Sequence, residues 1–92
     1  MPYMTYELDL SSSHSAEDTK VGLRDKGFLG KKIIVLSAPS ECYIYLDRPS
    51  NDRIYCFQNL TIERRFEEIY VSNPSGGSGY LRLYIEYKEV ES

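Results

Sequence analysis

The sequence has no tryptophan, one histidine and two cysteines, and these scarcities exclude several classes of protein. His14 lies in a serine-rich segment, where a Ser-His pair has no ordered platform for nucleophilic catalysis. Cys42 and Cys56 form no CxxC pair and have no histidine nearby, so their spacing does not match a zinc site. We therefore expect a protein that is not an enzyme and that uses no metal and no cofactor.

Long apolar runs and an excess of positive charge are also missing. No apolar stretch is long enough to span a bilayer as a helix, so we expect no membrane partner. The formal net charge is −3, with Asp and Glu interleaved among Lys and Arg, which does not favour a nucleic-acid partner bound through its phosphates. The first ten residues lack the basic start and apolar stretch of a secretory signal, which predicts synthesis in a cytosol.

The chain is 92 residues long, which suits a single domain, and its first thirty residues differ in texture from the rest. Residues 11–20, SSSHSAEDTK, have almost no apolar content, and residues 21–30 combine three glycines with scattered apolar side chains. Such a composition buries too little apolar surface to offset its ordering entropy. We therefore predict an extended or flexible N-terminal arm over residues 1–30, followed by a folded domain over residues 31–92.

From residue 31 onward the sequence consists of short runs of β-branched and aromatic residues separated by turn residues. Expected strands cover residues 31–37, 42–48, 53–58, 60–66, 67–73 and 80–88. In most runs apolar and polar side chains alternate, whereas residues 31–37 are continuous and predict a strand covered on both sides. The second and third runs predict a hairpin. The pattern as a whole predicts an all-β fold, a small antiparallel β-sandwich that is jelly-roll-like.

Nine tyrosines are many for this length, and the alternation sets several of them opposite the aliphatic side chains. Tyrosine offers a large contact area and a hydroxyl that can stay hydrated, and arginine pairs with carboxylates or stacks on rings. We predict Tyr43, Tyr45, Tyr80, Arg82 and Tyr84 as protein-contact residues. Two alternatives stay open: these rings pack as a second core face, or they stack on a bound sugar.

The two cysteines are expected on neighbouring strands. Antiparallel pairing of those strands lets the two sulfurs face each other, which permits a disulfide. Their apolar neighbours, among them Ile44 and Ile54, favour buried free thiols instead. The sequence leaves both states open.

Residues 66–87, FEEIYVSNPSGGSGYLRLYIEY, resemble the terminal hairpin of small β-rich virion proteins of tailed bacteriophages and related viruses. In those proteins an aromatic strand, a Gly/Ser turn and a strand of the LRLYI type close a sandwich, and residues 31–47, KKIIVLSAPSECYIYLD, fit the same pattern. The resemblance carries no catalytic or ligand-binding residue.

A non-enzymatic virion structural protein is what this resemblance implies: a head decoration or cement protein, or a neck or tail component. Such a protein is made in the host cytoplasm and is then present in the virion in many copies. Its expected partners are further copies of itself, as a homo-oligomer, and other virion structural proteins. The alternative function is a soluble carbohydrate- or ligand-binding β-module that uses the same surface tyrosines.

Overall fold

A computed structural model describes residues 3–10, 15, 20–39, 41–73 and 79–89. Within this part of the chain there are eight strands and one short 3-10 helix. They are β1 (Tyr3–Asp9), β2 (Lys20–Gly22), η1 (Arg24–Lys26), β3 (Phe28–Ser37), β4 (Tyr43–Leu46), β5 (Ile54–Tyr55), β6 (Thr61–Phe66), β7 (Glu68–Ser72) and β8 (Tyr80–Glu89). The six strands expected from the sequence correspond to β3–β8, and the all-β class is confirmed.

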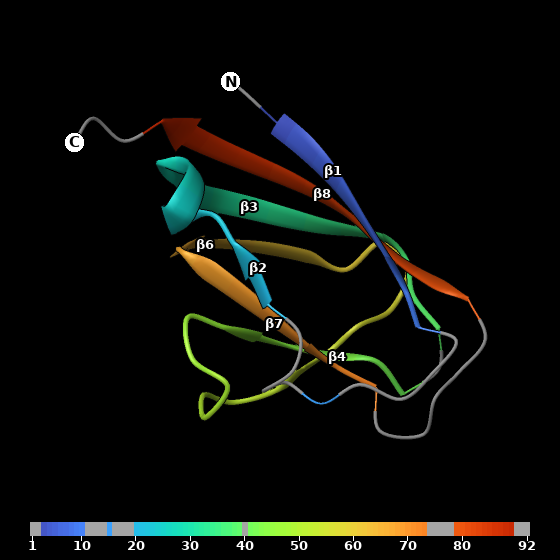
Figure 1. Cartoon of the computed structure of the whole chain (residues 1–92). Coiled ribbons are helices and arrows are strands. Elements are labelled where there is room, and N and C mark those ends of the chain that lie inside the picture. The colour runs from blue at the N-terminus through green and yellow to red at the C-terminus, as the bar shows by residue number, and fades with distance from the viewer. Residues whose placement is uncertain (1–2, 11–14, 16–19, 40, 74–78, 90–92) are drawn as a thin grey trace.

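The strands form two antiparallel sheets of four strands each (Figure 1). The first sheet has the order β1-β8-β3-β6, and the second sheet has the order β2-β7-β4-β5. Successive strands alternate between the sheets except for β4 and β5, which pair as the predicted hairpin. This order is that of an eight-stranded jelly roll built from two Greek keys, so the predicted sandwich architecture is confirmed.

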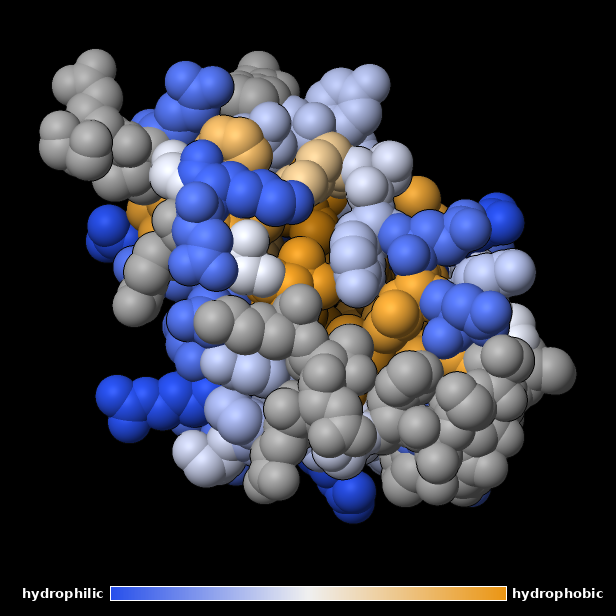
Figure 2. All heavy atoms as spheres, in the orientation of Figure 1, coloured by the Kyte–Doolittle hydropathy of each residue, from blue (hydrophilic) through white to orange (hydrophobic). Residues whose placement is uncertain are grey.

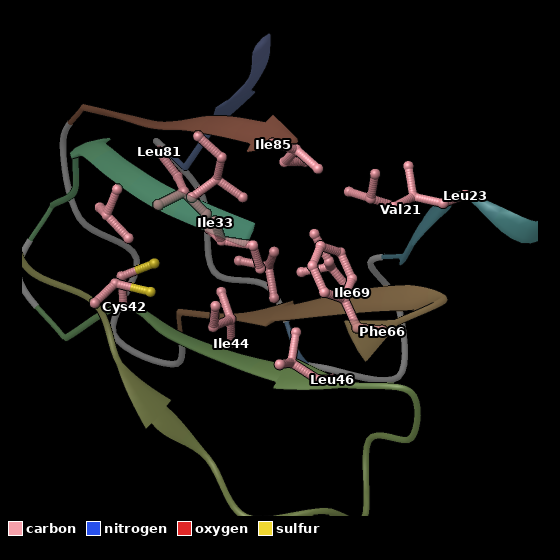
Figure 3. Packing of buried hydrophobic residues seen from close by; sticks show 14 of the residues in the cluster. Val21, Leu23, Ile33, Cys42, Ile44, Leu46, Phe66, Ile69, Leu81 and Ile85 are labelled. Atoms are coloured by element: carbon pink, nitrogen blue, oxygen red, sulfur yellow. The ribbon is translucent and has the colours of Figure 1, made fainter. Parts of the chain in front are cut away.

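The hydrophobic core lies between the two sheets, where their inward side chains meet (Figure 3). The fully buried strand side chains are Ile33, Val35, Phe66, Leu81, Leu83 and Ile85 from the first sheet, and Ile44, Leu46, Ile69 and Val71 from the second. Period-2 alternation along each strand produces this arrangement, because every second side chain points to the same face of a sheet. Figure 2 shows apolar atoms in the hollow between the sheets and hydrophilic side chains around it.

The predicted N-terminal arm is wrong for the described residues of the first thirty. β1 pairs with β8 along its whole length, and β2 pairs with β7. Leu10, Val21 and Leu23 are buried in the common core, and the proposed boundary at residue 30 falls inside β3. A strand as short as β2 has no detectable periodicity, and the inward residues of β1 include a methionine and a tyrosine, which hid its apolar side. Residues 11–14 and 16–19 lie outside the described residues.

Two further expectations are corrected. Residues 66–87 do not form a terminal hairpin, because β7 lies in the second sheet and β8 in the first. In addition, β3 is covered on one side only: Ile33 and Val35 are buried, whereas Leu36 is 42% exposed on the outer side. The apolar run reflects the central place of β3 in the sheet, because β3 pairs with β6 on one side and with β8 on the other.

Candidate protein interface

The five predicted contact residues do not form one site. Tyr43 and Tyr45 lie on the outer face of the second sheet, on β4. Tyr80, Arg82 and Tyr84 lie on the outer face of the first sheet, on β8. The core separates the two groups, so each outer face has to be considered as a surface of its own.

The outer face of the second sheet carries a continuous group of aromatic side chains, which we call the aromatic face. Its members are Tyr43, Tyr45, Arg53, Tyr55, Phe57 and Tyr70. The register places Tyr43 opposite Tyr55 and Tyr45 opposite Tyr70 on neighbouring strands. The ring centroids of Tyr43 and Tyr55 are 5.7 Å apart, and those of Tyr55 and Phe57 are 6.3 Å apart. These separations lie within the range of favourable aromatic pairs.

The β4–β5 hairpin presents these rings at the edge of the sheet. Asp47 directly follows β4 and has a positive φ of 71°. Its Oδ1 accepts hydrogen bonds from the backbone N–H groups of Glu67, at 2.7 Å, and Glu68, at 3.4 Å. The side-chain amide of Asn51 donates to the carbonyl oxygen of Leu46 at 2.7 Å. These bonds fix the end of β4 and the loop after it. β5, the short edge strand that follows, carries Tyr55 outward.

Exposure of the aromatic face is high for rings of this size. Tyr55 is 52% exposed and Phe57 is 51% exposed, while Tyr43, Tyr45 and Tyr70 are half-buried. The guanidinium carbon of Arg53 lies 4.6 Å from the centre of the Tyr43 ring, a cation–π contact that keeps the cation on this face. The face therefore combines ring surface with a cation that can reach a partner's carboxylate.

The outer face of the first sheet is different, because its polar groups bond to one another. Arg82 Nε lies 2.8 Å from Glu7 Oε2 across the β1–β8 pair. The Tyr84 hydroxyl donates to Glu86 Oε1 at 3.3 Å, and the Tyr84 ring stacks on Tyr3 at 5.1 Å. The pKa of Tyr84 is raised, first by loss of solvent around the phenol and then by the Glu86 carboxylate. Arg82 and Tyr84 thus each have a partner inside the chain, as does Tyr70 of the aromatic face, whose hydroxyl donates to Glu68 Oε2 at 2.9 Å.

Both cysteines are buried free thiols, with Cys42 directly before β4 (Figure 3) and Cys56 directly after β5. The backbone N–H of Cys56 donates to the carbonyl oxygen of Cys42 at 2.8 Å, which places the two side chains beside each other. A hydrogen bond between the thiols lowers the pKa of Cys42. The same hydrogen bond raises the pKa of Cys56, and burial raises it further. The two thiols are therefore held within reach of each other.

Sequence reasoning missed three rings of the aromatic face: Tyr55, Phe57 and Tyr70. The sequence did contain a signal for the first two. When Ile54 and Cys56 point inward, alternation along the strand makes Tyr55 and Phe57 point outward. The same alternation applies to Tyr70 in β7. The cross-strand register, which brings Tyr43 to Tyr55 and Tyr45 to Tyr70, has no counterpart in the sequence.

In the described part of the chain, no group of three or more His, Cys, Asp or Glu side chains is placed to hold a metal ion. His14 lies outside the described residues. None of the described helices has the length and apolar character needed to cross a membrane. No family model, no curated protein and no solved structure matches this chain.

Proposed function

We propose that this chain is a non-enzymatic structural protein that assembles in many copies through protein–protein contacts, as a component of a virus particle. The observation that carries the assembly role is the aromatic face, which gathers five rings and an arginine on one side of a small sandwich. Tyrosine, phenylalanine and arginine are the residue types enriched where protein surfaces bind each other.

Tyr55 and Phe57 are the two most exposed rings of the aromatic face. About half of the surface of Tyr55 and of Phe57 is open to solvent. Full burial of a phenylalanine-sized side chain is worth about 1.5–3 kcal/mol, so a partner that covers both half-exposed rings gains about 1.5–3 kcal/mol in total. Hydrophobic rings at the centre with Arg53 beside them are typical of an interface hot spot.

The virus-particle part of the proposal has two supports. Residues 66–87 resemble strands of small virion proteins, although the structure places these strands in different sheets. The jelly-roll order also occurs in viral capsid domains, but it occurs in lectin and cupin domains as well, so the fold by itself is compatible with several functions.

The test measures assembly as a function of protein concentration, by light scattering after size-exclusion chromatography. The purified chain is measured alone and mixed with candidate capsid or tail proteins. In the variant Tyr55→Ser/Phe57→Ser the folded domain should remain, as judged by circular dichroism. Its association should weaken by at least about tenfold, equivalent to 1.4 kcal/mol, because two hot-spot rings are lost.

A matched control removes two exposed rings from the opposite outer face, in the variant Tyr3→Ser/Tyr80→Ser. These tyrosines are 61% and 46% exposed, so similar ring surface is removed. This control should assemble nearly as the unchanged chain does. A chain that stays monomeric alone and with every particle component, or a control that loses assembly equally, would show that the aromatic face is not the interface.

The second candidate function is carbohydrate binding, and the row of rings from Tyr43 through Tyr55 to Phe57 is the observation that favours it. Adjacent rings at an exposed edge can stack on the apolar faces of successive sugar units. Binding of a soluble oligosaccharide by the monomer, lost in Tyr55→Ser/Phe57→Ser and kept in the opposite-face control, would support this function. Assembly in the absence of any sugar would favour the structural role instead.

A further inference from the structure

Four basic side chains gather around one depression at the end of the first sheet, although acidic and basic residues are interleaved along the sequence as a whole. The depression has a volume of about 390 Å³. Its lining residues are Leu29, Lys31, Glu63, Arg64, Arg65 and Lys88. The net charge of the whole chain is −3, so this cluster of four cations runs against the overall charge.

An irregularity in strand pairing brings these side chains together. On the β6 side, Gly30 pairs with Phe66 and Lys32 pairs with Glu63, so that two arginines of β6 lie opposite Lys31. On the β8 side, Gly30 pairs with Tyr87 and Lys32 with Glu86, which leaves Lys31 as the extra residue of a bulge. A bulge of this kind redirects side chains at a sheet edge, and here it groups cations from neighbouring strands.

The four cations have no anionic partner among the described residues. Glu63, the one acid in the depression, lies 3.6 Å from the Nζ atom of Lys32, which is outside the cluster. Lys31, Arg64, Arg65 and Lys88 are all exposed. Like charges held close together repel one another, so a ligand with several negative charges would relieve that repulsion as well as form new ion pairs.

Two further features lie beside the cations. Leu29 is buried yet does not belong to the main hydrophobic core, and it forms an apolar floor to the depression. β6 is an edge strand of the first sheet, and no described strand pairs with its outer side. The depression thus offers cations, an apolar contact and unpaired backbone N–H and C=O groups within one surface.

Protection of the edge accounts for only part of this arrangement. Charged side chains on an edge strand are a common means of preventing aggregation, and Arg64 and Arg65 fit that role. Lys31 and Lys88 do not, because they belong to β3 and β8, in the interior of the sheet. Because Lys31 and Lys88 lie beside the arginines without protecting the edge, their position indicates that the four cations bind a ligand and do not serve only to repel other strands.

We propose that this surface binds an extended, acidic segment of a partner protein, which adds to the outer side of β6 as a further strand. Carboxylates on one side of the added strand reach Arg64 and Arg65, Lys31 and Lys88 add positive potential from the two strands behind them, and the backbone supplies hydrogen bonds to β6. Arginine binds carboxylates in a bidentate manner, which fixes the register. Nucleic acid matches the cations, but its donors and acceptors do not repeat with the spacing of the N–H and C=O groups along a strand edge. The site is separate from the aromatic face and does not depend on the function assigned to it.

The test titrates the full chain with a short acetylated peptide of alternating glutamate and valine, labelled for fluorescence anisotropy. The peptide should bind, and its affinity should fall as sodium chloride is added, because the ion pairs are exposed and screened by salt. Arg65→Glu should weaken binding by at least about tenfold. Lys26→Glu makes the same charge change on an exposed residue of η1 and should change the affinity by less than about twofold.

Three further probes separate the alternatives. A peptide with N-methyl groups on the backbone nitrogens that face β6 should bind at least about tenfold more weakly, because strand hydrogen bonds are lost. The analogue with lysine in place of glutamate should not bind. Oligothymidylate should bind more weakly than the acidic peptide. Equal losses in Arg65→Glu and Lys26→Glu, undiminished binding of the N-methyl peptide, tighter binding of oligothymidylate, or no peptide binding at low salt would each overturn the proposal.

Discussion

The two sheets of the sandwich differ in how far each is completed within the chain. The strands of the first sheet have 7, 10, 10 and 6 residues, whereas those of the second have 3, 5, 4 and 2. Both outer faces carry exposed rings, but Tyr55 and Phe57 of the second sheet lie beside each other, whereas Tyr3 and Tyr80 lie at opposite ends of the β1–β8 pair. Less backbone pairing and adjoining exposed rings occur together in the second sheet, which makes it the one that a partner would complete.

The largest expected effect comes from closing the β4–β5 hairpin of the second sheet with a disulfide. Oxidised glutathione should accept two electrons from the thiols of Cys42 and Cys56, so that an S–S bond forms, two protons are released and two glutathione thiolates leave. The closed loop of about 15 residues should stabilise the fold by about 3 kcal/mol through the lower entropy of the unfolded chain. Urea unfolding of the oxidised and reduced forms, with the bond verified by mass spectrometry, measures this difference.

The serine variant Cys56→Ser serves as the control and should gain nothing from the oxidant. Hydrogen exchange then shows where the gain arises: amides of β4 and β5 should become more protected than the change in global stability predicts. A disulfide that forms and lowers stability, or protection that rises only in the first sheet, would contradict the view that the second sheet is the less complete one.

The next effect concerns the first sheet, whose packing leaves no space beside Gly30. A Cβ atom at this position would lie 2.3 Å from the nearest ring carbon of Phe66. Gly30→Ala should therefore destabilise the fold by about 1–3 kcal/mol, because the ring has to move within a close-packed core. Urea unfolding of the single variants and of Gly30→Ala/Phe66→Leu gives the coupling. The alanine should be less harmful when residue 66 is leucine, and strictly additive effects would show that the ring is not the obstacle.

Much of the fold could be predicted from the sequence because most strands bury alternate residues. Leu81, Leu83 and Ile85 illustrate this in β8, where apolar side chains recur at every second position. β1 and β2 could not be predicted in the same way, since β2 has three residues and β1 pairs with a strand seventy or more positions away. Which sheet each strand joins is likewise a long-range property, and the error about residues 66–87 arose there.

For the candidate interface too, local alternation could be predicted from the sequence and long-range strand pairing could not. Alternation along β4 correctly directed Tyr43 and Tyr45 outward. It could not show that the predicted tyrosines divide between two opposite faces, because that depends on strand order. The basic depression depends on pairing as well: Lys31 meets Arg64 and Arg65 only through the bulge between β3 and β6.

A smaller effect is expected from the ion pair on the outer face of the first sheet. Glu7 and Arg82 are 53% and 55% exposed, so solvent screens their attraction. Glu7→Gln should lower stability by about 0.2–1 kcal/mol, and added salt should reduce the difference. Thermal unfolding at low and high salt measures it. A loss well above 1 kcal/mol that persists in salt would mean that this face is a cooperative polar network, a stronger contrast with the aromatic face than we propose.

The smallest effect is on stability at alkaline pH, and it comes from Tyr6, an inward side chain of β1. Burial raises the pKa of Tyr6 above its ordinary value of 10.0. Above pH 10 the unfolded chain therefore releases this proton before the folded chain does, so stability falls with rising pH, while below pH 10 this phenol contributes no pH dependence. Tyr6→Phe should make the fall shallower without abolishing it, because the pKa of Tyr84 is raised too. Urea unfolding at a series of pH values above 9 measures the slope. An identical slope in the variant would show that β1 opens before the rest of the first sheet, and that this sheet is not complete along its β1 edge.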